Sequence, residues 1–251
     1  MTLLQIDNIS ISFQEQQTLS NISFDVQEGE FVSIVGPSGC GKSTLFHVLG
    51  GLFKPDEGDV WLKGKNITGT TGHVSYMPQQ ISLLPWRNVL DNVLLSQELA
   101  NHKRDNNLAK KMLKRAGLDQ YENAYPDELS GGMKQRVAFV RALLGPQSLL
   151  CLDEPFSSLD EFTRLDMQNW LLSMWEEMRP TVLFITHQID EAILLSDRIL
   201  VLSPRPATLL EKVEVPFERP RNDSMLLDPE FIRLKSRIMS MIRGAERLEN
   251  H

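Results

Sequence analysis

Residues 36–44 are the stretch of this sequence best suited to bind phosphate. They read Gly36-Pro37-Ser38-Gly39-Cys40-Gly41-Lys42-Ser43-Thr44, between an apolar run at 31–35 and a helix-like run at 45–52. A strand, a glycine-rich turn and a helix in this order let backbone N–H groups converge on phosphate oxygens. Lys42 supplies a positive charge for the terminal phosphates, and the Ser43 hydroxyl can ligate Mg²⁺. The stretch fits G-x-x-x-x-G-K-[ST] and predicts a nucleoside triphosphate site.

Two carboxylates follow an apolar strand later in the chain. The run 149–152 leads directly into Asp153 and Glu154. A phosphate loop needs a Mg²⁺ partner at the end of a neighbouring strand, so we predict that Asp153 holds Mg²⁺ or its waters. Glu154 is then the natural general base for an attacking water, and His187, after the apolar run 181–186, can orient the water or the terminal phosphate. The alternatives are a strand that ends in solvated acids and a structural histidine.

A second glycine-rich helix start lies at Ser130-Gly131-Gly132, within residues 129–136. Ser130 is suited to cap the helix, and a helix N-terminus attracts anions. Because the chain already has a phosphate loop at 36–44, we interpret this second site as serving the nucleotide of another subunit. A plain capped helix is the alternative.

The elements that must position these residues can be read from the spacing of apolar residues. Alternation at 3–13 and 22–26, on either side of a polar turn, predicts a half-buried antiparallel hairpin. Short strands are predicted at 59–64 and 74–77. Buried parallel strands are predicted at 149–153, 181–186 and 199–202. Helices are predicted at 89–100, 108–116, 133–144, 161–178, 190–196 and 229–248. The pattern indicates an α/β core that a helical insertion at 84–144 interrupts, in one folding unit.

Composition narrows the class of protein. The chain has 251 residues, of which 41% are hydrophobic and 24% charged, enough for a full hydrophobic core. The formal net charge of −7 argues against general nucleic-acid binding, which needs a basic face. No apolar stretch is long enough for a membrane span, and the start lacks the pattern of a signal peptide. A disulfide between Cys40 and Cys151 would obstruct the phosphate loop and a strand, so we expect a reducing, cytosolic compartment.

Together these motifs resemble the ATP-binding subunit of ATP-binding cassette (ABC) transporters, over nearly the whole chain. Residues 36–44 match the family's Walker A motif, 149–154 its Walker B motif, and 129–136 its signature. Residues 157–160 resemble its D-loop, which ends at Asp160, and His187 resembles its switch histidine.

Two further residues acquire roles through the resemblance. Gln79 falls at the Q-loop glutamine, which in the family contacts Mg²⁺ and water, although the neighbouring Gln80 leaves this register open by one residue. Phe13 falls where an aromatic ring stacks on adenine, and it replaces the commoner tyrosine. The sequence also departs from the family pattern at Pro78 and Gln188, and none of these departures removes a catalytic group.

The resemblance implies a P-loop NTPase of the ABC-cassette fold, in one domain over residues 1–251. Its parts are a RecA-like core with an antiparallel β subdomain (1–83 and 145–215), a helical subdomain (84–144) and a C-terminal helical tail (216–251). The expected cofactors are ATP and Mg²⁺. The expected ATP contacts are Phe13, residues 36–44, Ser130, Gly131, Gly132 and Asp160. The expected Mg²⁺ ligands are Ser43, Gln79 and Asp153, and the expected catalytic residues are Glu154, His187 and Gln79.

The resemblance also implies partners and a location. In the family two cassettes form a head-to-tail dimer, with each ATP between the Walker A motif of one copy and the signature of the other. ATP binding closes the dimer, and hydrolysis reopens it and drives a membrane permease. We therefore expect a homodimer that is peripheral at the cytoplasmic face of the membrane. Its partners would be permease subunits and, indirectly, a solute-binding protein, with no nucleic acid.

Three peptides suggest a branch of the family. Residues 84–89, 190–198 and 203–206 are similar to those of importers of nitrate, sulfonates, taurine and pyrimidine precursors of thiamine, and the last cargo is the one we predict. The alternatives are an exporter cassette, a cytosolic ABC protein of DNA repair or translation, and a small P-loop kinase, which would leave the signature without a role. Trp86 is either part of the surface that docks on the permease or a core residue of the helical lobe.

Overall fold

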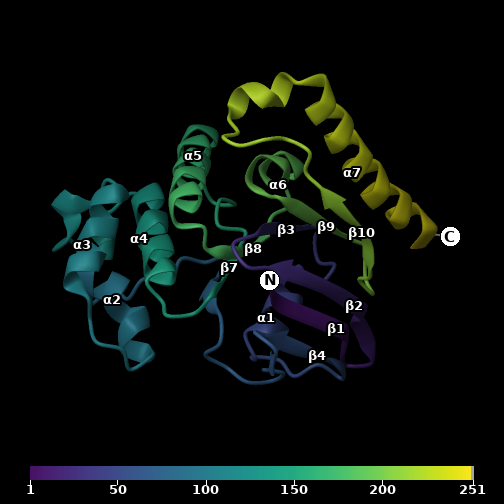
Figure 1. Ribbon diagram of the computed structural model, residues 1–251, viewed down its shortest axis with the longest axis horizontal. Coiled ribbons are helices and arrows are strands. Elements are labelled where there is room, and N and C mark those ends of the chain that lie inside the picture. The colour runs from purple at the N-terminus through teal and green to yellow at the C-terminus, as the bar shows by residue number, and fades with distance from the viewer. Residues whose placement is uncertain (250–251) are drawn as a thin grey trace.

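The computed structural model describes residues 1–249, which form two β-sheets and the helices around them (Figure 1). The first sheet has the order β2-β1-β4-β5, and the second has the order β10-β9-β3-β8-β7-β6. The strands of the first sheet are β1 (Thr2–Phe13), β2 (Gln16–Gln27), β4 (Glu57–Leu62) and β5 (Lys65–Asn66). The strands of the second sheet are β3 (Phe31–Val35), β6 (Ser75–Met77), β7 (Leu149–Asp153), β8 (Thr181–Ile185), β9 (Arg198–Leu202) and β10 (Leu209–Glu214).

The first sheet begins with the predicted antiparallel hairpin. The turn between β1 and β2 consists of Gln14 and Glu15, with φ of 48° and 67°. Positive φ at both central residues matches the twist of the strands that such a turn joins. The strand predicted at 59–64 begins and ends two residues earlier. Its end is fixed by Lys63 and Gly64, whose φ angles of 51° and 73° turn the chain.

The second sheet is parallel from β6 to β9, as the continuous apolar runs predict. Every residue of β3, β7, β8 and β9 is buried, which is typical of strands covered on both faces. Strand β10 pairs antiparallel with β9 at the edge and was not predicted. Its residues are mostly exposed or half-buried, so its pattern lacks the strong apolar signal of the central strands.

Seven α-helices surround the sheets in the described part of the chain. They are α1 (Lys42–Leu49), α2 (Val89–Leu99), α3 (Asn106–Arg115), α4 (Gly131–Leu143), α5 (Glu161–Met178), α6 (Ile189–Leu195) and α7 (Pro229–Glu249). Helices α2, α3 and α4 gather at one end of the molecule, and α7 runs along the other end beside α6 and β10 (Figure 1). Their starts follow local capping: Asn88 and Asp105 accept the backbone N–H of Asp91 and Leu108. No helix within residues 1–249 combines the length and apolar content that a membrane crossing needs.

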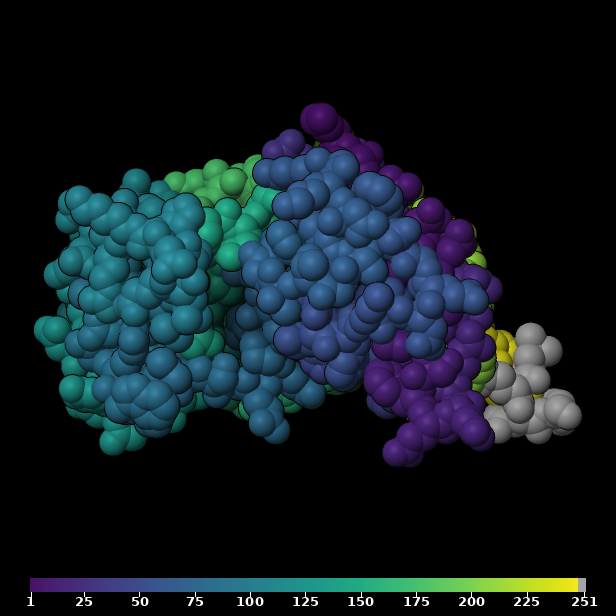
Figure 2. Space-filling model, turned by 90° about the horizontal axis from the view of Figure 1, so that it is seen from below, coloured from purple at the N-terminus to yellow at the C-terminus, as the bar shows by residue number. Residues whose placement is uncertain are grey.

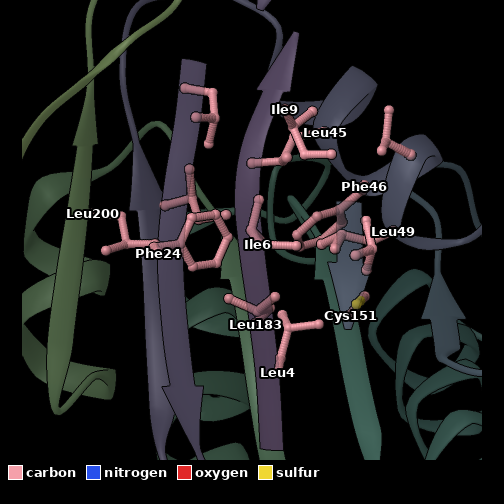
Figure 3. Packing of buried hydrophobic residues seen from close by; sticks show 14 of the residues in the cluster. Leu4, Ile6, Ile9, Phe24, Leu45, Phe46, Leu49, Cys151, Leu183 and Leu200 are labelled. Atoms are coloured by element: carbon pink, nitrogen blue, oxygen red, sulfur yellow. The ribbon is translucent and has the colours of Figure 1, made fainter. Parts of the chain in front are cut away.

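Helix α1 packs between the two sheets and holds the phosphate loop at their junction. Leu4, Ile6 and Ile9 of β1 and Phe24 of β2 point toward the helix and the second sheet, where they share one core (Figure 3). The members of this core labelled in the figure from α1 and the second sheet are Leu45, Phe46, Leu49, Cys151, Leu183 and Leu200. Cys40 and Cys151 are buried free thiols, as expected.

Candidate nucleotide-binding and hydrolysis site

The phosphate loop connects the end of β3 to the first turn of α1. Gly41 has φ of 122°, and a Cβ there would lie 2.8 Å from Leu19 Cδ2, so a larger residue would strain the backbone and clash with β2. Lys42 Nζ donates hydrogen bonds of 2.9 Å to the carbonyl oxygens of Gly36 and Pro37. These contacts hold the ammonium group against the backbone of the loop.

The predicted Mg²⁺ ligands Ser43 and Asp153 meet at the end of β7. Ser43 Oγ donates to Asp153 Oδ1 at 3.3 Å, and Tyr76 Oη donates to Asp153 Oδ2 at 3.1 Å. Asp153 is only 3% exposed, and burial raises the pKa of its carboxyl group. Burial and the charge of Asp153 also raise the pKa of Tyr76. A buried carboxylate and a hydroxyl are oxygen ligands of the kind Mg²⁺ prefers, so these residues fit that ion.

Three side chains that follow β6, β7 and β8 meet at one carboxylate oxygen next to Asp153. Gln79 Nε2 donates to Glu154 Oε2 at 3.2 Å, and His187 Nδ1 lies 3.2 Å from the same oxygen. Glu154 has φ of 44°, and its backbone N–H donates to the carbonyl of Ile185 in β8 at 2.9 Å. This left-handed conformation is costly for a glutamate and fits a residue that its surroundings hold in place. The structure brings Gln79, rather than Gln80, to Glu154.

The second glycine-rich segment forms the exposed start of α4. Ser130 Oγ accepts the backbone N–H of Met133 at 3.3 Å and caps the helix, as predicted. A Cβ added at Gly131 would meet no other atom of residues 1–249 within 4 Å, while one at Gly132 would lie 2.8 Å from Thr163 in α5. Asp160 caps α5 by accepting the N–H of Thr163 at 3.1 Å. Hydrogen bonding to the side chain of Thr163, and then to its backbone N–H, lowers the pKa of the Asp160 carboxyl group.

The structure thus keeps the two predicted anion sites apart. Within the described residues, no hydrogen bond or ion pair joins Ser130–Gly132 or Asp160 to the phosphate loop. Phe13, at the end of β1, is 41% exposed and packs edge-on against Phe53 with ring centroids 5.3 Å apart. Its exposed ring can therefore receive a flat base.

Sequence reasoning missed two residues of this region. Tyr76 binds Asp153 because β6 and β7 are neighbours, which no local pattern reveals. Arg205 Nη2 donates to the carbonyl of Gly39 in the phosphate loop at 2.8 Å. The peptide 203–206 is distinctive in the sequence, yet this contact spans 166 residues and depends on how β9 lies beside β3.

Comparison with known proteins identifies the family. A protein-family model described as "ABC transporter" matches residues 19–157, more than half of the chain. The chain belongs to the ABC transporter family. This cassette is the ATP-binding subunit of an ABC transporter and an ATPase of that class.

Relatives and solved structures agree with this assignment. The cassette is 39% identical over 240 residues to the aliphatic sulfonates import ATP-binding protein SsuB of Bacillus thuringiensis subsp. konkukian, covering 94% of each chain. It is 40% identical over 230 residues to the nitrate import ATP-binding protein NrtD of Synechococcus elongatus, covering 89% of this chain and 84% of NrtD. A solved dimer of the ATP-binding cassette MJ0796, bound to ADP and Pi, matches 86% of this chain and all of that one, with TM-score 0.72 and 29% identity.

Proposed function

We propose that this subunit binds ATP with Mg²⁺ and hydrolyses it to drive an importer of a small organic solute or anion. The observation that carries this proposal is the position of Glu154, whose Oε2 is held by Gln79 and His187 next to the Ser43–Asp153 pair. A carboxylate in this position can take a proton from water as the water attacks the terminal phosphate.

The roles of the side chains follow from their chemistry. Lys42 and the backbone N–H groups of the phosphate loop bind the phosphates, and Phe13 stacks on adenine. Ser43, Asp153 and Gln79 would hold Mg²⁺, which supplies positive charge to phosphate oxygens when bound. His187 orients the water or the terminal phosphate beside Glu154. Gln79, in the segment that follows β6, connects that segment to Glu154 through its hydrogen bond to Oε2.

We also propose that two copies share their nucleotides. The start of α4 is exposed at Ser130 and Gly131, and Gly132 lies against Thr163 in the first turn of α5, which Asp160 caps. A helix N-terminus carries about half a positive charge, so it favours a phosphate from another subunit. The dimeric assembly of MJ0796, which is bound to ADP and Pi, supports this proposal by analogy.

The importer branch is supported by the relatives, whose names describe sulfonate and nitrate import. Among cargoes we retain a pyrimidine precursor of thiamine as the first proposal, with sulfonate, taurine or nitrate as the others. The subunit would lie at the cytoplasmic face of the membrane, bound to permease subunits that receive solute from a solute-binding protein. The division into a core with its β subdomain, a helical subdomain and a C-terminal tail belongs to the same proposal.

The permease would dock near Gln79 and the helical lobe. A groove of about 860 Å³ lies between β6 and the helices α2 and α4, lined among others by Tyr76, Leu95 and Arg141. Figure 2 shows this surface hollowed between the lobe that contains α2 and the part formed by residues near 60–80. Trp86 is 71% exposed, so the alternative that it is a core residue is wrong, and its ring is available to a partner.

The experiment that tests the hydrolytic site replaces Glu154→Gln, which keeps the shape of the side chain and removes its basicity. ATP turnover should fall about 10²- to 10⁴-fold, because that is what general-base catalysis contributes, while ATP binding persists. Glu57→Gln, at an exposed carboxylate on β4, is the matched control and should hydrolyse ATP normally. Turnover by Glu154→Gln within a few-fold of the wild type would contradict the assignment.

A further inference from the structure

A buried carboxylate lies next to the hydrolytic site without an assigned role. Glu191, on α6, is 4% exposed. Its Oε2 accepts a hydrogen bond of 2.5 Å from Thr186 Oγ1, and its Oε1 accepts one of 3.0 Å from Gln168 Nε2 on α5. Thr186 and Gln168 are themselves 2% and 4% exposed. A buried carboxylate is tolerated only where such donors satisfy its oxygens.

The hydrogen bonds fit an ionised Glu191. Thr186 Oγ1 accepts the backbone N–H of Gln188 at 3.0 Å, which leaves its own proton free for Glu191. Burial raises the pKa of Glu191, and the bond from Thr186 and the charge of Arg164 oppose this. Arg164 Nε lies 3.9 Å from Glu191 Oε1, so the guanidinium and the carboxylate face each other. This Nε is buried and has no hydrogen-bond partner among residues 1–249.

This cluster touches two functional loops at once. Thr186 directly precedes His187, whose Nδ1 lies 3.2 Å from Glu154 Oε2. Arg164 Nη2 donates to the carbonyl oxygen of Leu159 at 2.8 Å, in the loop that ends at Asp160. Hydrogen bonds and one ion pair therefore run from the peptide that carries His187, through Glu191, to the loop that precedes α5.

We propose that Glu191 is a positioning residue for ATP hydrolysis, which fixes the peptide of His187 and couples it to the loop at Leu159–Asp160. The inference rests on the proposed function, because it acts through the role given there to His187. Glu191 accepts a hydrogen bond from the Thr186 hydroxyl, and that hydroxyl accepts one from the backbone N–H of Gln188. His187 lies between Thr186 and Gln188 in the chain. When His187 shifts, the displacement passes through Glu191 and Arg164 to the loop expected to face a second copy.

The test compares Glu191→Gln, His187→Ala and the double variant in steady-state ATP hydrolysis by the full chain. Glu191→Gln keeps the size of the side chain and removes the charge opposite Arg164. We expect kcat to fall about 10- to 100-fold, as small misplacements of catalytic groups do, with KM for ATP within about twofold. In the His187→Ala background the same substitution should cause no further loss, because residues that act through each other are not additive.

Glu30→Gln is the control for the loss of a half-buried, charge-paired carboxylate. Glu30 accepts hydrogen bonds of 2.8 and 2.9 Å from Arg198, at the opposite end of β3 from the phosphate loop. The Glu30→Gln substitution should lower the melting temperature of the protein and leave kcat for ATP hydrolysis unchanged. If Glu191→Gln does not fold, Thr186→Val removes the Thr186–Glu191 hydrogen bond by deleting the donor. This variant should show the same fall in kcat, and it should cause no further loss in the His187→Ala background.

Three outcomes would overturn the inference. Glu191→Gln, or Thr186→Val in its place, could keep the kcat of the wild type. Its loss could add in full to that of His187→Ala, which would make it a separate structural effect. Finally, His187→Ala itself could hydrolyse ATP normally, which would overturn both this inference and the role of His187. The general-base role is judged independently by Glu154→Gln, so the two failures can be told apart.

Discussion

At the scale of single residues, the site depends on side chains that leave the sheet at the same edge. Gln79, Glu154 and His187 each follow the carboxyl end of a parallel strand, and β6, β7 and β8 are neighbours in the sheet. Parallel strands place their carboxyl ends at one edge, so residues far apart in the sequence meet there. The shared oxygen, Glu154 Oε2, is the point of contact.

The division of labour between Lys42 and Glu154 gives a prediction at this scale. Lys42→Ala should weaken ATP binding by about 1.5–3 kcal/mol, the value of a hydrogen bond to a charged group, or about 10- to 150-fold in Kd. Glu154→Gln should leave Kd near that of the wild type, because Glu154 acts on water. Isothermal titration calorimetry with ATP measures both. Equal affinities for the two variants would mean that the roles are misassigned.

At the scale of elements, the loop between β9 and β10 joins the two sheets around the phosphate loop. Ala207 donates its N–H to the carbonyl of Thr18 in β2 at 2.9 Å, and the N–H of Ser20 returns to the carbonyl of Ala207 at 2.9 Å. From this anchored loop Arg205 reaches the carbonyl of Gly39. The phosphate loop therefore has hydrogen bonds to two cationic side chains. Arg205 comes from the loop between β9 and β10, and Lys42 comes from the first turn of α1.

Arg205→Ala should weaken ATP binding, because the phosphate loop loses a bond that does not compete with phosphate. A net contribution of about 1 kcal/mol for one hydrogen bond corresponds to about fivefold in Kd, and Arg205→Lys should recover part of it. Arg233→Ala, at an exposed residue of α7, removes the same charge elsewhere and should not change Kd. The same shift in both variants would instead indicate a general charge effect.

At the scale of the whole molecule, one chain presents two predicted anion sites, at the phosphate loop and at the start of α4, and no hydrogen bond joins them within the described residues. The phosphate loop lies at the junction of the two sheets, and the start of α4 belongs to the helical lobe. A dimer in which each lobe covers the phosphate loop of the other copy would complete both sites.

Mixing two inactive variants tests this arrangement. In a dimer of Lys42→Ala with Ser130→Arg, one composite site carries both lesions and the other carries neither, so ATP hydrolysis should return on mixing. If heterodimers form and stay inactive, either the sites are not shared or both must act together. A heterodimer with a single lesion separates these cases, because it would also be inactive only if both sites must act.

The sequence by itself determined the features that depend on neighbours along the chain. The phosphate loop, the strand at 149–153 and the helix at 161–178 were predicted at their observed places, since periodicity and capping act within a few residues. The helix cap at Ser130 was predicted for the same reason. The roles of the site residues remain predictions that these positions support.

Only the tertiary structure decided which side chains meet. Tyr76 reaches Asp153 across 77 residues, and Arg205 reaches Gly39 across 166, because strand order brings their segments together. Glu191 of α6 meets Gln168 of α5 and Thr186, which follows β8. Strand β10 forms by pairing with the free edge of β9. Most of its residues are exposed or half-buried, so its sequence lacks the apolar pattern that predicts a strand. Local patterns specify elements, but contacts between elements depend on how their apolar faces are buried together.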